Sequence, residues 1–321
     1  MSAAGPSFQG AAPAPLISVV LPVYNAAETV GRAIESVLAQ SCEKFELIII
    51  DDCSEDGTPA AVAHFSTGDC RIVFLRQVTR SGSNAARNKG IRSARAELIS
   101  FLDADDCFHA HKLEWVLNFF ASHQATDVLL DSFEVVDVVA ERRVQKINPD
   151  LGNTSQIEEG IYRRTINKPT PAISVRRAAL LGAGLFDETL RRRQDMDMLL
   201  RLIRAQANFA TTSEVLWTKY WLPQSITAQA ATFLEALIDI CERHPKYIQN
   251  PVFRQGLALD FARHLGRLVW AGRSTAAFRD FHRFSQAYGW GLAVSLLATG
   301  TALRVQRRLV DLARKKLRLL H

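Results

Sequence analysis

Cysteine is scarce in this chain of 321 residues and follows no metal-binding or disulfide pattern. The five cysteines form an odd set without a C-x-x-C pair: Cys42, Cys53, Cys70, Cys107 and Cys241. A disulfide framework or a zinc site is therefore not expected, and this usage is typical of a reducing cytosol. The first fifteen residues are rich in Ala, Pro and Gly and lack the basic and apolar regions of a signal peptide, which predicts a flexible lead over 1–15.

Long apolar runs and phosphate-binding glycine loops are also missing. No stretch reaches about 18 uninterrupted apolar residues, so no membrane-spanning helix is expected. G-x-G-x-x-G does not follow the first apolar run, and G-x-x-x-x-G-K-[ST] does not occur. These absences argue against nicotinamide and P-loop chemistry. A nucleotidyltransferase would need a Gly-rich, basic loop at the same point, where the chain has "PVYNAAET".

Excess positive charge is confined to one end of the chain. The net charge is +6, from 39 Lys and Arg against 33 Asp and Glu. Residues 301–321 hold seven basic residues and one acid, Asp311, so they account for the whole excess. Basic and aromatic residues are not interleaved in the rest of the chain, and nucleic acid is therefore not an expected partner.

Apolar runs alternate with helical patterns in the first third of the chain. The runs cover 17–23, 45–52, 71–77 and 97–106, and helical spacing follows at 24–40, 57–65 and 82–95, with Asn25 as the expected N-cap of the first helix. This alternation predicts an α/β fold with a mostly parallel central sheet flanked by helices. Ligands of such sheets lie beyond the carboxyl ends of the strands, where Tyr24-Asn25, Asp51-Asp52 and Asp103–Asp106 are expected.

The remainder of the chain predicts further mixed structure and then helices alone. A helix is expected at 109–122, a strand at 127–138, a polar irregular stretch at 141–160, and ordered structure at 171–188 and 194–206. From about residue 230 onward only helical patterns occur, which predicts an α-helical C-terminal appendage.

The stretch "ISFLDADDCF" (99–108) crowds three carboxylates, Asp103, Asp105 and Asp106, at the end of an apolar run. An EF-hand loop does not fit, because Phe108 stands where the sharp turn needs glycine. Two interpretations remain open. Asp105 or Asp106 caps the helix that begins near His109, or the group holds a hard divalent cation that also binds a diphosphate.

Several ordered motifs together resemble one enzyme family. They are "ISVVLPVYNAAETVGRAIESVLAQSCEKFELIIIDDCSEDGT", "GSNAARNKGIRSARAELISFLDADD", "GLFDE" (184–188) and "QDMDMLLRL" (194–202). The chain resembles the family-2 inverting glycosyltransferases of bacterial surface-polysaccharide type over about residues 17–227. The resemblance implies a GT-A fold, a nucleotide-sugar donor with UDP as the expected nucleotide, a divalent metal (Mn²⁺ or Mg²⁺), and a glycan or lipid-linked acceptor.

The resemblance also assigns roles to residues of the nucleotide-sugar half. Pro22 and Tyr24 line the base pocket, and Asp52 accepts a hydrogen bond from the base. Asp103 and Asp105 match the D-x-D element: Asp103 is expected near the ribose or sugar and Asp105 on the metal-diphosphate, with Asp106 a second candidate ligand. Arg87 and Asn88 approach the sugar or phosphates, although Arg87 also fits a solvated helix residue.

Asp195 matches the family's catalytic base. Inversion needs a carboxylate that takes the proton of the attacking acceptor hydroxyl. Capping of the following helix is the alternative role for Asp195, and Asp197 is the second candidate base. The acid that usually precedes the base is replaced by Gln194.

A second departure from the family pattern is Leu222, at the place of a histidine that often closes on the metal-diphosphate. No histidine occurs between 124 and 243, so closure falls to Lys219, Tyr220 or Trp221, or the metal is held without that ligand. The two departures keep open a non-catalytic nucleotide-sugar or polysaccharide-binding scaffold of the same fold.

The resemblance and the patterns give expected boundaries. They are a glycosyltransferase domain at 16–228, divided into a nucleotide-sugar half (16–108) and an acceptor half (109–228), and a helical region at 229–321. "RRR" at 191–193 either holds an anionic acceptor or is solvated surface. The last twenty residues place apolar and basic side chains on opposite helix faces. They are expected to bind the cytoplasmic face of the inner membrane, with packing on the protein's own domain as the alternative.

Overall fold

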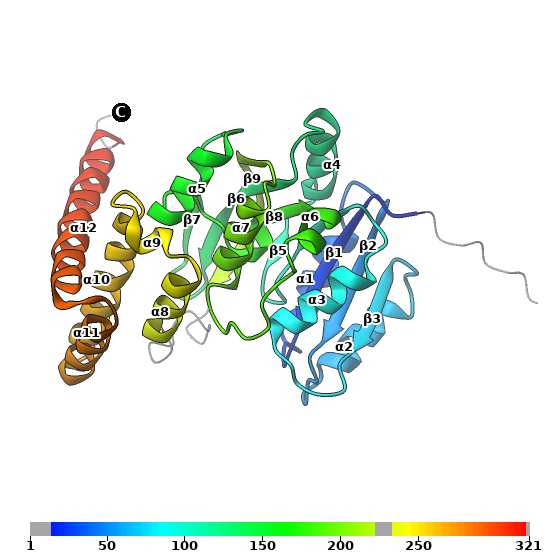
Figure 1. Ribbon diagram of the computed structural model, residues 1–321. Coiled ribbons are helices and arrows are strands. Elements are labelled where there is room, and N and C mark those ends of the chain that lie inside the picture. The colour runs from blue at the N-terminus through cyan, green and yellow to red at the C-terminus, as the bar shows by residue number, and fades with distance from the viewer. Residues whose placement is uncertain (1–13, 222–232, 319–321) are drawn as a thin grey trace, which may run out of the picture.

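The computed structural model describes residues 14–221 and 233–318, and for 305–318 the backbone alone. Most of the expected lead, the departure at Leu222, the domain boundary at 228 and the basic side chains beyond residue 304 lie outside the described residues. Figure 1 shows a central sheet covered by helices on both faces, with the C-terminal helices at the left-hand side of that view.

The N-terminal half of the sheet is parallel, as the apolar runs predict. Its strands are β1 (Ile17–Val23), β2 (Phe45–Asp51), β3 (Ile72–Arg76) and β4 (Leu98–Phe101), in the order β3-β2-β1-β4. Every neighbouring pair in this order is parallel. The crossover helices are α1 (Val30–Leu38), α2 (Thr58–Ser66) and α3 (Ser83–Ser93). All residues of β1 and β2 are buried, because helices cover both faces of a parallel sheet.

The first helix begins later than expected. Its N-cap is Thr29, and Asn25 lies in the preceding loop with a positive φ of 45°. The Asn25 side chain accepts a hydrogen bond from the Glu55 amide, and Ser54 Oγ accepts one from the Asn25 amide. The prediction of an Asn25 cap is therefore wrong, because the side chain joins two loops at the carboxyl edge of the sheet.

The second half of the sheet is mixed. The full order is β3-β2-β1-β4-β8-β6-β9-β5, with β7 paired to β6. The added strands are β5 (Cys107–Phe108), β6 (Val128–Asp137), β7 (Arg142–Lys146), β8 (Ile173–Arg176) and β9 (Phe209–Trp221). The added helices are α4 (Lys112–Ser122), α5 (Thr154–Arg163), the 3₁₀ turn η1 (Thr170–Ala172), α6 (Arg177–Gly182) and α7 (Gln194–Arg204). β8 is antiparallel to both β4 and β6, whereas β9 is parallel to β6.

The prediction of irregular structure at 141–160 is wrong. β7 and α5 occupy most of this stretch. The side chains of β7 are polar and mostly exposed. This strand forms a hairpin with β6 and pairs with no other described strand. α5 buries only one face, through Ile157, Ile161 and Tyr162, so its apolar signal is short.

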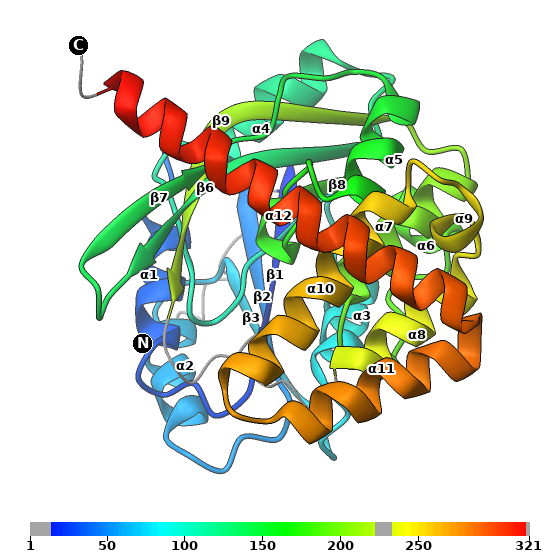
Figure 2. The same ribbon diagram turned by 90° about the vertical axis from the view of Figure 1, so that its left-hand side faces the viewer.

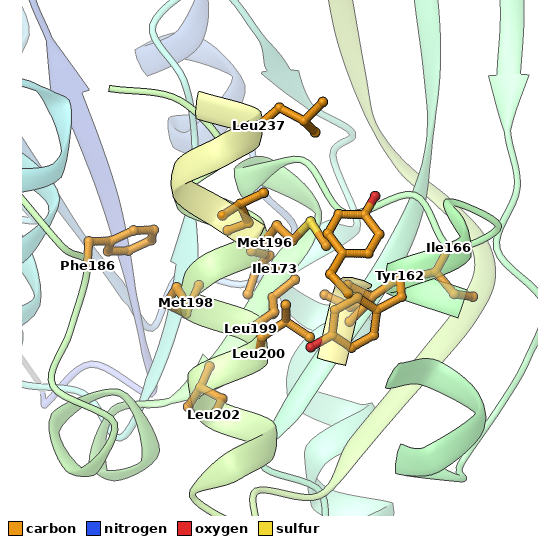
Figure 3. Packing of buried hydrophobic residues seen from close by; sticks show 14 of the residues in the cluster. Tyr162, Ile166, Ile173, Phe186, Met196, Met198, Leu199, Leu200, Leu202 and Leu237 are labelled. Atoms are coloured by element: carbon orange, nitrogen blue, oxygen red, sulfur yellow. The ribbon is translucent and has the colours of Figure 1, made fainter. Parts of the chain in front are cut away.

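The C-terminal helices share one core with the sheet. They are α8 (Phe233–Arg243), α9 (Lys246–Gln249), α10 (Arg254–Trp270), α11 (Ser274–Tyr288) and α12 (Trp290–Arg318). Their buried residues form a single hydrophobic cluster with α3, α5 and α7, and Figure 3 shows the part of this cluster around α7. The other face of the sheet packs against α1, α2 and α4.

Two glycines allow the C-terminal helices to approach closely. A Cβ on Gly256 of α10 would lie 1.8 Å from the Tyr162 carbonyl oxygen of α5. A Cβ on Gly300 of α12 would lie 2.0 Å from the Ala258 carbonyl oxygen of α10. The first part of α12 therefore packs on the protein itself, as Figure 2 shows for its course over α10.

None of the described helices combines the length and the apolarity that a bilayer crossing requires.

Candidate active site

The carboxyl ends of β1 and β2 place Pro22, Tyr24 and Asp52 at one edge of the sheet. Pro22 is buried within β1, and Tyr24 is partly exposed just beyond it. The Tyr24 ring is covered by the guanidinium of Arg80, 4.0 Å from the ring centroid. The Tyr24 ring therefore forms a cation–π contact with Arg80 at this edge of the sheet.

Asp52 is 4% exposed and organises the loop after β3. Its Oδ1 accepts hydrogen bonds from Gln77 Nε2 and the Ser81 amide, each at 2.7 Å. Its Oδ2 accepts one hydrogen bond from the described residues, from the Gly82 amide at 2.8 Å, and keeps a lone pair for a further donor. The neighbouring Asp51 instead binds Arg76 and the Ser54 amide.

Arg87 and Asp103 form an ion pair at the start of the carboxylate group. Arg87 Nη2 lies 2.8 Å from Asp103 Oδ1, and the Arg87 residue is only 4% exposed. The interpretation of Arg87 as a solvated helix residue is therefore wrong. Its Nε is buried without a hydrogen-bond partner in the described part of the chain, which leaves a donor for an added acceptor group.

Helix α3 also holds the loop that leads to Asp195. Asn88 Nδ2 donates to the Phe186 carbonyl and to Glu188 Oε1, and Asn88 Oδ1 accepts the Phe186 amide. Asn84 Nδ2 donates to the carbonyls of Asp187 and Leu190. Both amide hydrogens of Asn88 are thus used within the protein, so only its oxygen remains for a bound sugar.

The negative charges of Asp105 and Asp106 are less well compensated than that of Asp103, which forms a close ion pair with Arg87. Burial, and then the charge of Asp103, raise the pKa of Asp105. Asp106 is fully buried; burial and the charges of Asp103 and Asp105 hold its pKa well above the usual value despite Lys219. Asp106 Oδ1 accepts the Tyr220 amide of β9, and Oδ2 has no hydrogen-bond partner among the described residues, with Lys219 Nζ 3.7 Å away.

Neither Asp105 nor Asp106 caps any helix that the structure describes. The N-cap of α4 is His111, which makes no side-chain capping bond, and the helix starts at Lys112. The capping interpretation of the carboxylate group is therefore wrong. Lys219 is the cation that faces it from β9: burial lowers the pKa of Lys219, but the charges of Asp106, Asp103 and Asp105 outweigh burial and raise it.

The donor set fits a divalent cation that depends on a phosphate ligand. Within the described residues, no group of three or more His, Cys, Asp or Glu side chains is arranged to hold a metal ion alone. The buried Asp106 Oδ2 without a hydrogen-bond partner and the partly exposed Asp105 are hard oxygen ligands. One or two carboxylates completed by diphosphate oxygens and water is a common Mg²⁺ environment.

Asp195 lies in the first turn of α7, partly exposed. The N-cap is Arg193, so the capping interpretation of Asp195 is wrong. Its Oδ1 contacts the Met196 amide, and its carboxylate forms no ion pair in the described part of the chain. Gln194 Oε1 is buried without a hydrogen-bond partner there.

Asp197, the second candidate base, is committed to structure. It is 2% exposed, and it binds Arg201 Nε at 2.8 Å and His244 Nε2 at 3.0 Å. Burial alone would raise the pKa of Asp197, but the hydrogen bond from His244 and the charge of Arg201 lower it. A carboxylate in this pair is not available to an acceptor hydroxyl.

The backbone before Asp195 is held from the C-terminal helices. Arg193 has a positive φ of 61°, which is uncommon outside glycine. Its Nη2 lies 2.7 Å from Asp260 Oδ2 of α10, and its guanidinium lies over the Phe233 ring of α8. The sequence pattern did not reveal Asp260, because a single acid in a helix of unknown packing carries no motif. Arg80 was missed because a single basic residue in a loop carries no motif either.

The fold is that of a known class of structures. A structure of S. aureus TarS, residues 1–349, in complex with UDP-GlcNAc superposes with a TM-score of 0.65 at 18% identity, covering 88% of this chain and 90% of that one. At this identity the match shows the fold alone, a GT-A fold with C-terminal helices, as predicted.

Sequence comparison then gives the family. The chain belongs to the family described as Glycosyl transferase family 2, whose profile matches residues 18–181. This confirms the family that the motifs predict.

Curated relatives share parts of the chain. A putative teichuronic acid biosynthesis glycosyltransferase, TuaG of Bacillus subtilis, is 41% identical over 105 residues, which is 33% of this chain and 42% of that protein. The UDP-Glc:alpha-D-GlcNAc-diphosphoundecaprenol beta-1,3-glucosyltransferase WfgD of Escherichia coli is 34% identical over 122 residues, 38% of this chain and 47% of that protein. An uncharacterized glycosyltransferase of Rickettsia typhi is 29% identical over 202 residues, 60% of each chain. The chain thus spans less than two thirds of the length of these three relatives.

Proposed function

We propose that the chain transfers a sugar from a UDP-sugar to a hydroxyl of a glycan or lipid-linked acceptor, with inversion at the anomeric carbon. One observation carries the proposal. Helix α3 binds Asp103 through Arg87 and the loop before Asp195 through Asn84 and Asn88. A single rigid element therefore holds the proposed donor carboxylates and the segment that leads to the proposed base.

The donor side is assigned from the sheet edge. Tyr24 stacks on the base above Pro22, and the free lone pair of Asp52 Oδ2 accepts the base N–H. Asp103 orients the ribose or sugar while Arg87 holds its carboxylate. Asn88 uses its remaining oxygen capacity on the sugar or acts only by fixing the 186–188 loop.

A divalent cation, Mn²⁺ or Mg²⁺, held by Asp105 and Asp106, would supply positive charge to the departing diphosphate. Lys219 adds a fixed positive charge at the same place, 3.7 Å from Asp106 Oδ2. Asp195 takes the proton of the attacking hydroxyl in a single displacement, because its carboxylate is partly exposed and outside any ion pair in the described chain.

A panel of UDP-sugars incubated with Mn²⁺ and bacterial glycan or lipid-linked acceptors tests the proposal. Release of UDP coupled to a new glycosidic bond of inverted configuration is expected for one donor. Tight UDP-sugar binding without turnover across the panel would instead indicate the non-catalytic scaffold that Gln194 keeps open.

Replacing Asp105 by Asn is expected to weaken metal-dependent UDP binding by at least about tenfold, or about 1.4 kcal/mol. The reason is that an amide removes one anionic oxygen ligand from the partly exposed carboxylate. Calorimetric titration with UDP, in Mn²⁺ and in EDTA, measures the effect, and Glu141→Gln, an exposed acid after β6, is the charge-matched control. An equal loss in EDTA would show that Asp105 does not act through a cation.

We further propose that the chain lies on the cytoplasmic face of the inner membrane. Support comes from the seven basic residues of 301–321 and from exposed Trp270, Phe278 and Trp290 on the C-terminal helices. Each basic residue near an anionic leaflet contributes about 1 kcal/mol. Removal of 305–321, which leaves the packed part of α12, is expected to weaken binding to anionic vesicles at least about 100-fold in a sedimentation assay. Equal binding by the full and shortened chains would contradict the proposal.

A further inference from the structure

The backbone that carries the three clustered carboxylates is held by side chains of α1 and of the residues directly after it. We call residues 103–109 the carboxylate turn. Ser36 Oγ of α1 accepts a hydrogen bond from the Phe108 amide at 3.1 Å. Gln40, just beyond α1, donates through Nε2 to the His109 carbonyl oxygen at 2.8 Å. These two contacts fix the end of the carboxylate turn, where β5 lies.

Arg32 extends this set of contacts to the proposed cation ligands. Arg32, Ser36 and Gln40 are spaced four residues apart, and side chains at this spacing leave a helix on the same side. The Arg32 guanidinium donates from Nη2 to the Asp105 carbonyl oxygen at 3.0 Å. A side chain of α1 therefore holds the backbone of the residue whose carboxylate is a proposed cation ligand.

Strand β9 supports the same turn independently of α1. It pairs with β5 in antiparallel register, with Thr218 opposite Cys107. The Tyr220 amide donates to Asp106 Oδ1 at 3.2 Å, and Lys219 Nζ lies 3.7 Å from Asp106 Oδ2. The position of the end of β9 therefore sets the surroundings of the second proposed cation ligand.

The Arg32 side chain joins the two supports. Its Cζ lies 3.7 Å from the centroid of the Tyr220 ring, within the range of a cation–π contact. A guanidinium is planar, so its face can stack on a ring while its edge donates to a carbonyl. One side chain therefore contacts both the backbone of Asp105 and the end of β9.

The contacts of Arg32 bear on the position of the turn more than on the stability of the fold. Arg32 is exposed, so its replacement creates neither a cavity nor a buried unpaired charge. Substitutions at such surface positions usually change the free energy of unfolding very little. A change in ligand binding in an Arg32 variant can therefore be measured on a folded protein.

We infer that Arg32 is a positioning residue that holds Asp105 and Asp106 for the cation and the diphosphate of the donor. Its guanidinium fixes the Asp105 backbone against the end of β9, where the Tyr220 amide binds Asp106. Ligands that are already in place leave less ordering to be done on binding, and affinity is higher for that reason. The inference deepens the proposed function and rests on it for the cation and the diphosphate.

Arg32→Gln is expected to weaken UDP binding about fivefold in Mn²⁺, through loss of the cation–π contact and the hydrogen bond, and to leave it unchanged in EDTA. Calorimetric titration of the whole chain with UDP measures both affinities. Arg273→Gln, an exposed arginine at the turn between α10 and α11, is the matched control with unchanged affinity. Full affinity of Arg32→Gln in Mn²⁺ would overturn the inference, and so would an equal loss in EDTA.

Further variants separate the contact from the mere presence of a positive charge. Tyr220→Phe keeps the ring and is expected to retain most of the affinity in Mn²⁺, whereas Tyr220→Leu removes the ring and is expected to lose about threefold. Arg32→Lys keeps the charge without the planar group and is expected to recover only part of the loss. Full affinity in Tyr220→Leu would overturn the inference.

Hydrogen exchange of the chain without ligand reports the position of the carboxylate turn directly. The Asp106 amide donates to the Asp103 carbonyl at 3.1 Å. Amides 104–108 are expected to exchange faster in Arg32→Gln than in the unaltered chain and at the unaltered rate in Arg273→Gln, because a turn without Arg32 opens more often. Unchanged exchange at 104–108 in Arg32→Gln would overturn the inference.

These measurements follow binding and exchange, so they are independent of sugar transfer. A chain that shows the expected Arg32 effects but never releases UDP from a UDP-sugar refutes the transferase and keeps the positioning role. A chain that transfers sugar while Arg32→Gln keeps full UDP affinity in Mn²⁺ does the reverse.

Discussion

Asp195→Asn is expected to lower kcat for sugar transfer by about 10²–10⁴-fold while leaving UDP binding unchanged. General base catalysis contributes an effect of this size, and an amide cannot accept the proton of the attacking hydroxyl. The change keeps the shape of the side chain, and Asp195 has no ion pair to lose in the described chain, so the fold is expected to persist. Initial rates with saturating UDP-sugar, together with UDP titration, measure both quantities.

Asp197→Asn is the matched control, since it makes the same chemical change two residues further along α7. Asp197 is bound to Arg201 and His244, so its replacement lowers the midpoint of thermal unfolding rather than the chemical step. If Asp195→Asn keeps kcat within about threefold of the unaltered enzyme, Asp195 is not the base.

Asp260→Asn is expected to lower the free energy of unfolding by about 3 kcal/mol, the lower end of the range for breaking a buried ion pair. The Asp260 side chain is 2% exposed, and its loss leaves Arg193, only 12% exposed, without its anion. Arg164 is 37% exposed and is rehydrated more readily, which keeps the effect at this lower end. The charges of Arg193 and Arg164 hold the pKa of Asp260 well below its usual range despite burial.

Urea unfolding of both forms measures this change. Asp239→Asn on α8, a 41% exposed acid paired with Arg243, is expected to cost less than about 1 kcal/mol. Asp260→Asn is also expected to lower kcat, because Arg193 fixes the backbone before Asp195. Asp260→Glu, which keeps the charge, is expected to recover part of both the free energy of unfolding and kcat. A loss below about 1 kcal/mol in Asp260→Asn would show that the two arginines find other partners.

The parallel half of the sheet was predictable because its signal is local. Each strand from β1 to β4 is a continuous apolar run, and each crossover helix follows within the same stretch of sequence. The order of the remaining strands could not be predicted from the sequence. β8 lies between β4 and β6, and these pairings join residues that are distant in the sequence. β7 was missed because its mostly polar residues carry no apolar alternation.

The site residues likewise divide into those that a sequence motif indicates and those that only the packing reveals. Asp103, Arg87 and Asp195 stand in motifs that a resemblance carries over residue by residue. The bond from Arg87 to Asp103 and the commitment of Asp197 to His244 depend on packing, since His244 comes from the end of α8. Asp260 has no motif at all. Its importance comes from the two arginines that bind it, and this is a property of the folded chain.

The shared core of sheet and C-terminal helices has a consequence for synthesis. The strands and the helix of the donor edge, β1–β4 and α3, lie within the first 101 residues, whereas its carboxylates follow at 103–106 and Lys219 comes from β9. The backbone before Asp195 needs Asp260, which leaves the ribosome 65 residues after Asp195 itself. Every residue of the proposed donor site is therefore synthesised before Asp260, and chemical competence arrives only when α10 has docked.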